Sequence, residues 1–133
     1  MSLNADAIRE VFADWAEGRF SAGAELLDDD VVFIVHPSLP EAGNAHGPDG
    51  VRDYMRGFLR QWDDYRLSPR SIEEIGDSVV VNILQLGRGR TSGIDGEVDS
   101  YMVFTFAGGR VTRIESMLER EEALAAAGGS GEG

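Results

Sequence analysis

The hydrophobic pattern changes its period part-way along the chain, and this change narrows the folds that the sequence can adopt. In much of the first half, apolar side chains recur every three or four positions, as they do on one face of an α-helix. From Tyr65 onward they alternate with polar side chains, as in strands that bury one face. Helices followed by a run of strands indicate an α+β domain with a mostly antiparallel sheet.

Two amphipathic helices are expected before the run of strands. Asn4 can cap the first and Gly18 can end it. The apolar stripe of this helix consists of Ile8, Val11, Phe12 and Trp15. Pro48 suits the first position of the second helix, where an N–H donor is not needed. The stripe of the second helix is the most regular in the chain and consists of Val51, Tyr54, Met55, Phe58, Leu59 and Trp62.

Strands are predicted where β-branched and aromatic residues lie between turn residues. The first is expected at Val31–Val35, after a short helix capped by Ser21, and residues 37–47 are expected to form a loop. Further strands are expected at 65–75, 78–86, 97–106 and 110–118, and a helix at 119–127. The turn between the last two strands is Gly108-Gly109. We expect one domain at 4–127, with 1–3 and 128–133 as tag remnants or a flexible tail.

The charge of the chain argues against several classes of partner. With 24 acidic and 12 basic residues, the formal net charge is −12. Binding to nucleic acid or to anionic membranes depends on clustered basic side chains. No apolar stretch of about 18 residues and no signal-peptide pattern is present. We therefore expect a cytoplasmic protein that binds neither nucleic acid nor membranes.

Two residue types are missing, and their absence excludes whole classes of chemistry. The chain has no cysteine, and all 12 basic residues are arginine, so it has no lysine. Thiolate nucleophiles, disulfides and Schiff bases are therefore excluded. His36 and His46 are the only histidines, too few for a multi-histidine metal site. We expect no metal and no organic cofactor.

Three strands carry an uncharged polar residue on an otherwise apolar face. Gln85 follows Val79, Val81 and Ile83, whereas Ser100 and Ser116 interrupt the corresponding faces of the next two strands. A buried polar group left without a partner costs about 1–3 kcal/mol. Either these side chains pair with one another or with the backbone in a packed core, or they line a cavity.

The opposite face of the same strands is also half apolar. The apolar residues on it are Val80, Leu84, Leu86, Tyr101, Val103, Val111 and Met117. The helices are expected to cover only one face of the sheet. A second copy of the chain is therefore the expected partner of this face, in a homodimer.

Two segments of the second half resemble the SnoaL-like polyketide-cyclase family. They are Gly87-Arg88-Gly89-Arg90-Thr91-Ser92-Gly93 and Gly109-Arg110-Val111-Thr112-Arg113, and the ending Glu122–Gly128 is similar to the closing helix of that family. The larger group is the nuclear transport factor 2-like superfamily, whose fold is also described as cystatin-like. The resemblance implies a cone-shaped, curved sheet wrapped around N-terminal helices, an apolar cavity and frequent dimers. It fixes function less well, because the superfamily contains isomerases, cyclases, epoxide hydrolases, dehydratases and non-enzymes.

The resemblance also indicates which catalytic groups are present. Ketosteroid isomerases hold a general-base aspartate before a proline at the end of the first strand, where this chain has His36-Pro37. Their oxyanion-hole acid corresponds to Met102, which has no proton to donate. The charged triad of limonene-type epoxide hydrolases corresponds to Ile83, Gln85 and Ser116, so that triad is absent.

The candidate site follows from these comparisons. His36 is the candidate catalytic base, because an imidazole titrates near neutral pH; the alternative is a structural histidine at a strand end. The candidate ligand-binding residues are Trp15, Tyr54, Phe58, Trp62, Gln85, Ser100, Met102 and Ser116. For the four aromatic residues, the alternative is a plain core position. Two functions remain open: an isomerase or cyclase that abstracts a proton next to a carbonyl, and a non-catalytic module that binds a small hydrophobic molecule.

Overall fold

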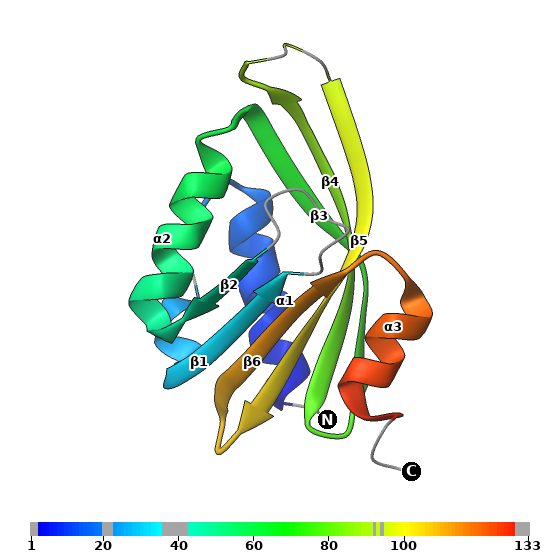
Figure 1. Cartoon of the computed structure of the whole chain (residues 1–133). Helices are drawn as coiled ribbons and strands as arrows, with labels where there is room; N and C mark the ends of the chain where they lie inside the picture. The colour runs from blue at the N-terminus through cyan, green and yellow to red at the C-terminus, as the bar shows by residue number, and fades with distance from the viewer. Residues whose placement is uncertain (1–2, 20–22, 36–42, 92, 94, 130–133) are drawn as a thin grey trace.

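The computed structural model describes residues 3–19, 23–35, 43–91, 93 and 95–129. Figure 1 shows the helices and strands of these residues, coloured along the chain. The helical elements are α1 (Leu3–Ala16), a 3-10 turn (Ala24–Leu26), α2 (Gly47–Leu59), α3 (Arg120–Leu124) and a π-helical turn (Ala125–Gly129). The strands are β1 (Leu27–Val35), β2 (Gly43–His46), β3 (Trp62–Ile75), β4 (Ser78–Gly89), β5 (Asp95–Ala107) and β6 (Arg110–Met117).

The described strands form one sheet in the order β2-β1-β6-β5-β4-β3. All neighbours are antiparallel except β1 and β6, which run parallel. The sheet is curved and open, with α1 and α2 on one side and α3 on the other (Figure 1). This arrangement confirms the predicted α+β class with a mostly antiparallel, cone-shaped sheet.

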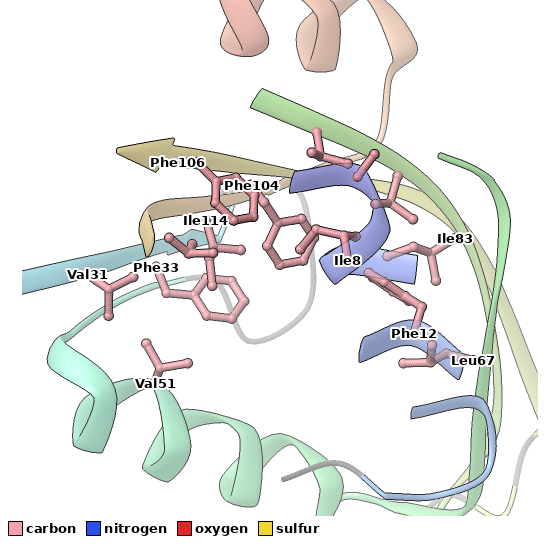
Figure 2. Close-up of a cluster of buried hydrophobic side chains, with 14 of the residues drawn as sticks. Ile8, Phe12, Val31, Phe33, Val51, Leu67, Ile83, Phe104, Phe106 and Ile114 are labelled. Carbon is pink, nitrogen blue, oxygen red and sulfur yellow. The ribbon is translucent and has the colours of Figure 1, made fainter. Parts of the chain in front are cut away.

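The main core lies between α1, α2 and the concave face of the sheet. Ile8 and Phe12 of α1 are almost fully buried, and the Phe12 ring meets the Phe104 ring edge to face at a centroid distance of 5.9 Å. Burying each of these large side chains contributes about 1.5–3 kcal/mol. Figure 2 shows this cluster, in which Val51 of α2 points toward the sheet. The predicted stripes of both helices therefore face one core.

The second helix is shorter than its stripe predicted, and Trp62 is not on it. The helix ends at Leu59, and the Arg60 N–H still bonds back to the Arg56 carbonyl oxygen at 3.1 Å. Trp62 is the first residue of β3, and its backbone pairs with Gly89 of β4. The helical spacing of apolar residues predicted Trp62 on the helix. Pairing of its backbone with β4 places it on a strand instead.

The segment 37–47 also differs from the expected loop. Residues 37–42 lie outside the described residues, but Gly43–His46 forms the edge strand β2, antiparallel to β1. Backbone pairing with β1 stabilises this four-residue strand, although its sequence has little strand propensity.

The second face of the sheet is partly covered by the chain itself, which corrects the expectation that no helix reaches it. Ala123 of α3 and Ala127 of the π-helical turn are buried against Val80, Val103 and Met117. Small side chains let this short helical segment approach the sheet closely. The homodimer expected on this face stays a prediction. Less apolar surface is left for its interface, because Ala123 and Ala127 cover part of the face.

One residue assigned to that second face lies in the main core. Val111 is 1% exposed and packs with the concave cluster, because the β5–β6 register shifts. Phe106 pairs with Val111 and Thr105 with Arg113, which leaves Thr112 as the extra residue of a bulge. The bulge reverses the alternation of β6. Leu86, assigned to the same second face, is 39% exposed and also contributes to the wall of the cavity described next.

Candidate functional site

An apolar cavity of about 90 Å³ lies between α1, α2 and the concave face of the sheet. All eight predicted ligand-binding residues contribute to its wall: Trp15, Tyr54, Phe58, Trp62, Gln85, Ser100, Met102 and Ser116. They come from two helices and from β3, β4, β5 and β6, so segments far apart in the sequence meet here. That these side chains bind a ligand stays a prediction.

Three aromatic rings form one wall of the cavity. Phe58 at the end of α2 lies 5.3 Å from Tyr65 and 6.0 Å from Trp62, between ring centroids. Trp62 and Tyr65 are 6.2 Å apart. Trp62 reaches the wall from β3, although the sequence placed it on the helix. The three rings form an edge-to-face and tilted cluster, the geometry that aromatic pairs prefer.

Gly87 of β4 makes room for this wall. A Cβ atom at position 87 would lie 2.8 Å from Cε3 of Trp62, closer than any ordinary carbon contact. The absence of a side chain at Gly87 therefore lets the indole ring lie close against β4. This role belongs to the glycine-rich run 87–93, which the sequence had indicated only as a family feature.

Two further aromatic rings contribute to the cavity wall from α1 and α2. Trp15 of α1 meets Phe12 edge to face at 4.9 Å, and Tyr54 of α2 lies 5.2 Å from Phe33 of β1. Phe12 and Phe33 are core residues, which hold Trp15 and Tyr54 in place. Trp15 and Tyr54 therefore pack against the core and also line the cavity, so the core position and the wall position predicted as alternatives are both present.

The polar part of the cavity is centred on Gln85. The Tyr65 hydroxyl donates a hydrogen bond of 2.5 Å to Oε1 of Gln85, and Nε2 of Gln85 donates one of 2.8 Å to Oγ of Ser100. Ser100 is only 2% exposed. Gln85 and Ser100 therefore pair with each other and also line the cavity.

Burial changes the ionisation of this cluster. It raises the pKa of the Tyr65 hydroxyl well above its ordinary value of 10.0, because a buried phenolate loses its hydration. Tyr65 therefore stays protonated at neutral pH and acts as a hydrogen-bond donor to Gln85. Tyr65 was not among the site residues predicted from the sequence, although it lies on β3, the strand that pairs with the Gln85 strand.

Ser116 faces the cavity from β6. Its Cα is paired with Met102 on β5 and with Val35 at the end of β1, and all three residues line the cavity. The Ser116 hydroxyl makes no hydrogen bond to another described residue. It is therefore available to a bound molecule.

The described cavity wall carries no aspartate, glutamate or histidine. Elsewhere in the described residues, no group of three metal-ligating side chains is present. Met102 occupies the position that the resemblance assigns to an oxyanion-hole acid, and its thioether has no proton to donate. The described part of the site therefore offers neutral hydrogen-bond donors and apolar surface.

The proposed base, His36, lies outside the described residues. Val35 before it is buried and lines the cavity. The other histidine, His46, is exposed at the end of β2, just before α2. It is not part of the cavity wall.

Arg88 and Arg90 form ion pairs at the far end of β4. Arg88 pairs with Asp95 at 2.9 Å and Arg90 with Asp63 at 3.1 Å. Asp63 belongs to β3 and not to a helix end. Because both arginines already have carboxylate partners, they add no anion site to the cavity.

Comparison with known proteins identifies the family. A model of the SnoaL-like domain matches residues 8–114, most of the chain. The chain belongs to the SnoaL-like domain family. The match spans α1 through most of β6, and thus nearly all of the cavity wall.

Solved structures show the same fold in other SnoaL-like and related proteins. A nuclear transport factor 2-like protein of unknown function from Burkholderia pseudomallei has a TM-score of 0.78 and 22% identity, covering 96% of this chain and 98% of its own. TerC, co-crystallised with polyporic acid, has a TM-score of 0.75 and 22% identity over 95% and 98% of the two chains. A Jannaschia protein named as a SnoaL-like polyketide cyclase has a TM-score of 0.74 and 17% identity over 93% and 90%. A search of curated proteins found no match. No helix in the described part of this SnoaL-like chain is long and apolar enough to cross a membrane.

Proposed function

We propose that this SnoaL-like protein binds a small, largely apolar molecule whose carbonyl or hydroxyl oxygen lies against Gln85 or Ser116. The observation that carries the proposal is the position of Gln85. Its amide is held between Tyr65 and Ser100, inside a wall that is otherwise almost entirely apolar. Apolar pockets with a few fixed polar groups are the usual form of small-molecule sites.

The unused hydrogen-bond donors of the cavity wall support a ligand that carries a hydrogen-bond acceptor. A glutamine amide carries two N–H donors, and Ser100 accepts one of them. The second donor and the Ser116 hydroxyl both belong to the cavity wall. A ligand oxygen that accepts from either of them would satisfy a polar group that the protein leaves available. TerC, which shares the fold, was co-crystallised with a small molecule, polyporic acid.

The test is a binding screen with a matched pair of variants. Uncharged polycyclic ketones, steroids and terpenoids are screened by thermal shift, and hits are measured by calorimetry. Gln85→Leu should weaken a carbonyl ligand about 3- to 10-fold, the equivalent of one hydrogen bond. Asn82→Leu, on the same strand but pointing to the opposite face, should leave the affinity unchanged. Equal loss in both variants, or no binding of any compound, contradicts the proposal.

A second candidate function is isomerisation or cyclisation of the bound carbonyl compound. The observation in its favour is that Val35, which lines the cavity beside Ser116, immediately precedes His36. The His36 imidazole would take a proton from the carbon next to the carbonyl. The C–H electron pair would then form a C=C bond, and the carbonyl pair would move onto oxygen, stabilised by a hydrogen bond from Gln85 or Ser116. In a ketone with a C=C bond beside that carbon, the enolate is a dienolate. Return of the proton to its far carbon restores the C=O bond and shifts the C=C bond, which completes an isomerisation.

This candidate has its own test. Once a bound ketone is known, its turnover is followed by deuterium exchange at the carbon next to the carbonyl. A positioned base contributes about 10²–10⁴-fold to such a step. His36→Ala should therefore lower kcat at least about a hundredfold and leave ligand affinity and the unfolding midpoint almost unchanged. Full exchange activity in His36→Ala would remove this residue from the mechanism and favour the non-catalytic function.

A further inference from the structure

A second, larger cavity adjoins the first. Its volume is about 360 Å³, and it lies between α1, α2 and the part of the sheet formed by β1, β5 and β6. Four residues belong to the walls of both cavities: Trp15, Phe33, Met55 and Met102. Val51 of α2 and Ile114 of β6, which Figure 2 shows on the two sides of the core, line only the second cavity.

The sizes of the two cavities indicate where the body of a ligand would lie. Ligand pockets in proteins usually measure about 300–1,000 Å³. The first cavity, at about 90 Å³, is smaller than this range, whereas the second, at about 360 Å³, falls inside it. A ligand of the usual size that hydrogen-bonds to Gln85 would therefore extend past the shared residues into the second cavity.

The shared residues suit such a passage. Met55 and Met102 are both unbranched and have three rotatable side-chain bonds. Each is only half-buried and packs at the border of the main core. Rotation of these two thioethers would join the cavities without a movement of the backbone.

The second cavity differs from the first in carrying positive charge on its wall. Arg52 and Arg56, one turn apart on α2, both contribute to it. Arg52 is paired with Asp49 at 2.5 Å. Arg56 has no carboxylate partner within the described ranges. In a chain of net charge −12 that pairs most of its arginines with carboxylates, an unpaired guanidinium beside an apolar cavity stands out.

We infer that the ligand is an apolar carboxylate, whose carboxylate group lies against Arg56 and whose apolar body occupies the second cavity and reaches toward Gln85. A guanidinium binds a carboxylate with two parallel hydrogen bonds and full charge complementarity. Apolar surface on both α2 and the sheet then covers the rest of the molecule. The inference rests on the proposed function, because it assigns a chemical class to the molecule bound there.

The experiment compares two probes that differ only in charge. Decanoate and decanamide are titrated into the full chain at low salt, followed by calorimetry. Decanoate should bind about tenfold more tightly, since a charge-assisted hydrogen bond is roughly twice as strong as a neutral one. Arg56→Gln should abolish this preference and change decanamide affinity less than about twofold. The matched control is Arg60→Gln, which removes the same charge from the residue directly after α2, outside both cavity walls.

A third variant tests the place of the apolar body. Val51→Phe adds bulk to the wall of the second cavity alone and should weaken both probes at least about fivefold. A bicyclic ketone, 2-decalone, serves as the reference ligand for the Gln85 cluster in the same titrations.

The outcomes separate the two claims. If 2-decalone binds in a Gln85-dependent way but decanoate shows no preference over decanamide, this inference is wrong and the proposed function stands. Equal effects of Arg56→Gln and Arg60→Gln would also overturn it, because general charge attraction would then explain the preference. If none of the three probes binds, both claims fall together.

Discussion

Tyr65 on β3 donates a 2.5 Å hydrogen bond to the side-chain oxygen of Gln85 on β4, so that one amide joins the aromatic wall of the cavity to its polar centre. The same amide continues to Ser100 on β5. Three neighbouring strands are therefore linked through the cavity by side chains as well as by their backbones. Any ligand bound at Gln85 would meet an amide whose orientation is already fixed.

The first prediction concerns the strength of this link. Tyr65→Phe should lower the free energy of unfolding by about 1–2 kcal/mol, because it removes the donor of a part-buried hydrogen bond. Gln85→Leu should lower it by at least as much, because it removes a partner from two such bonds. The double variant should lose about 0.5–1.5 kcal/mol less than the sum of the two. Urea unfolding followed by circular dichroism measures all three. Combining Tyr65→Phe with Asn82→Ala, on the other face of β4, should be additive, and additivity of the first pair would show that the bond is not formed.

The second prediction uses the raised pKa of Tyr65. Because burial favours the protonated phenol in the folded state, the unfolded chain releases this proton first as the pH rises. Stability from this group is complete below the ordinary tyrosine pKa of about 10 and declines above it, at up to about 1.4 kcal/mol per pH unit. Urea unfolding between about pH 9 and 11 should show this decline in the wild type and a shallower one in Tyr65→Phe. Identical slopes in the two proteins would contradict a buried, protonated Tyr65.

The third prediction concerns the fit of Trp62 against Gly87. Gly87→Ala places a methyl group 2.8 Å from the indole ring and should cost about 1–3 kcal/mol, with a shift in tryptophan fluorescence as the ring moves. Gly57→Ala is the matched control. That glycine lies within α2 with no atom within 4 Å of its Cβ position, so alanine there should stabilise the protein by up to about 1 kcal/mol. A neutral Gly87→Ala with unchanged fluorescence would place Trp62 elsewhere.

Strand alternation predicted the cavity better than helical spacing did. Gln85, Ser100 and Ser116 were assigned to one face from period-2 patterns alone, and all three line the cavity, because β4, β5 and β6 pair in regular register near these residues. Tyr65 was missed because β3 pairs with β4 irregularly, with shifts after Asp63 and after Pro69. Such shifts depend on the partner strand and leave no clear local pattern.

The failures in the second half have similar causes. Val111 was placed on the wrong face because the bulge at Thr112 is a property of the β5–β6 pair, not of β6 alone. The covering of the second face by Ala123 and Ala127 was missed because alanine at the end of a chain carries little hydrophobic signal. Contacts between elements distant in the sequence determine both the face on which Val111 lies and the covering of the second face of the sheet.

The last prediction tests how the second face of the sheet is used. Ala123 is fully buried against Val80, Val103 and Met117, so Ala123→Glu would place an unpaired carboxylate in an apolar contact. We expect α3 to detach, with a loss of about 2–4 kcal/mol in the free energy of unfolding and greater binding of a hydrophobic dye. Ala125→Glu, at an exposed position two residues further on, should change neither. Light scattering on the wild type at micromolar concentration should give about twice the chain mass if the predicted homodimer forms on the uncovered part of this face. That part also carries polar contacts, of Asp99 with Arg70 and Asn82, which any dimer interface must accommodate. A monomeric wild type would exclude the homodimer, and an Ala123→Glu variant as stable as Ala125→Glu would show that α3 does not hold this face.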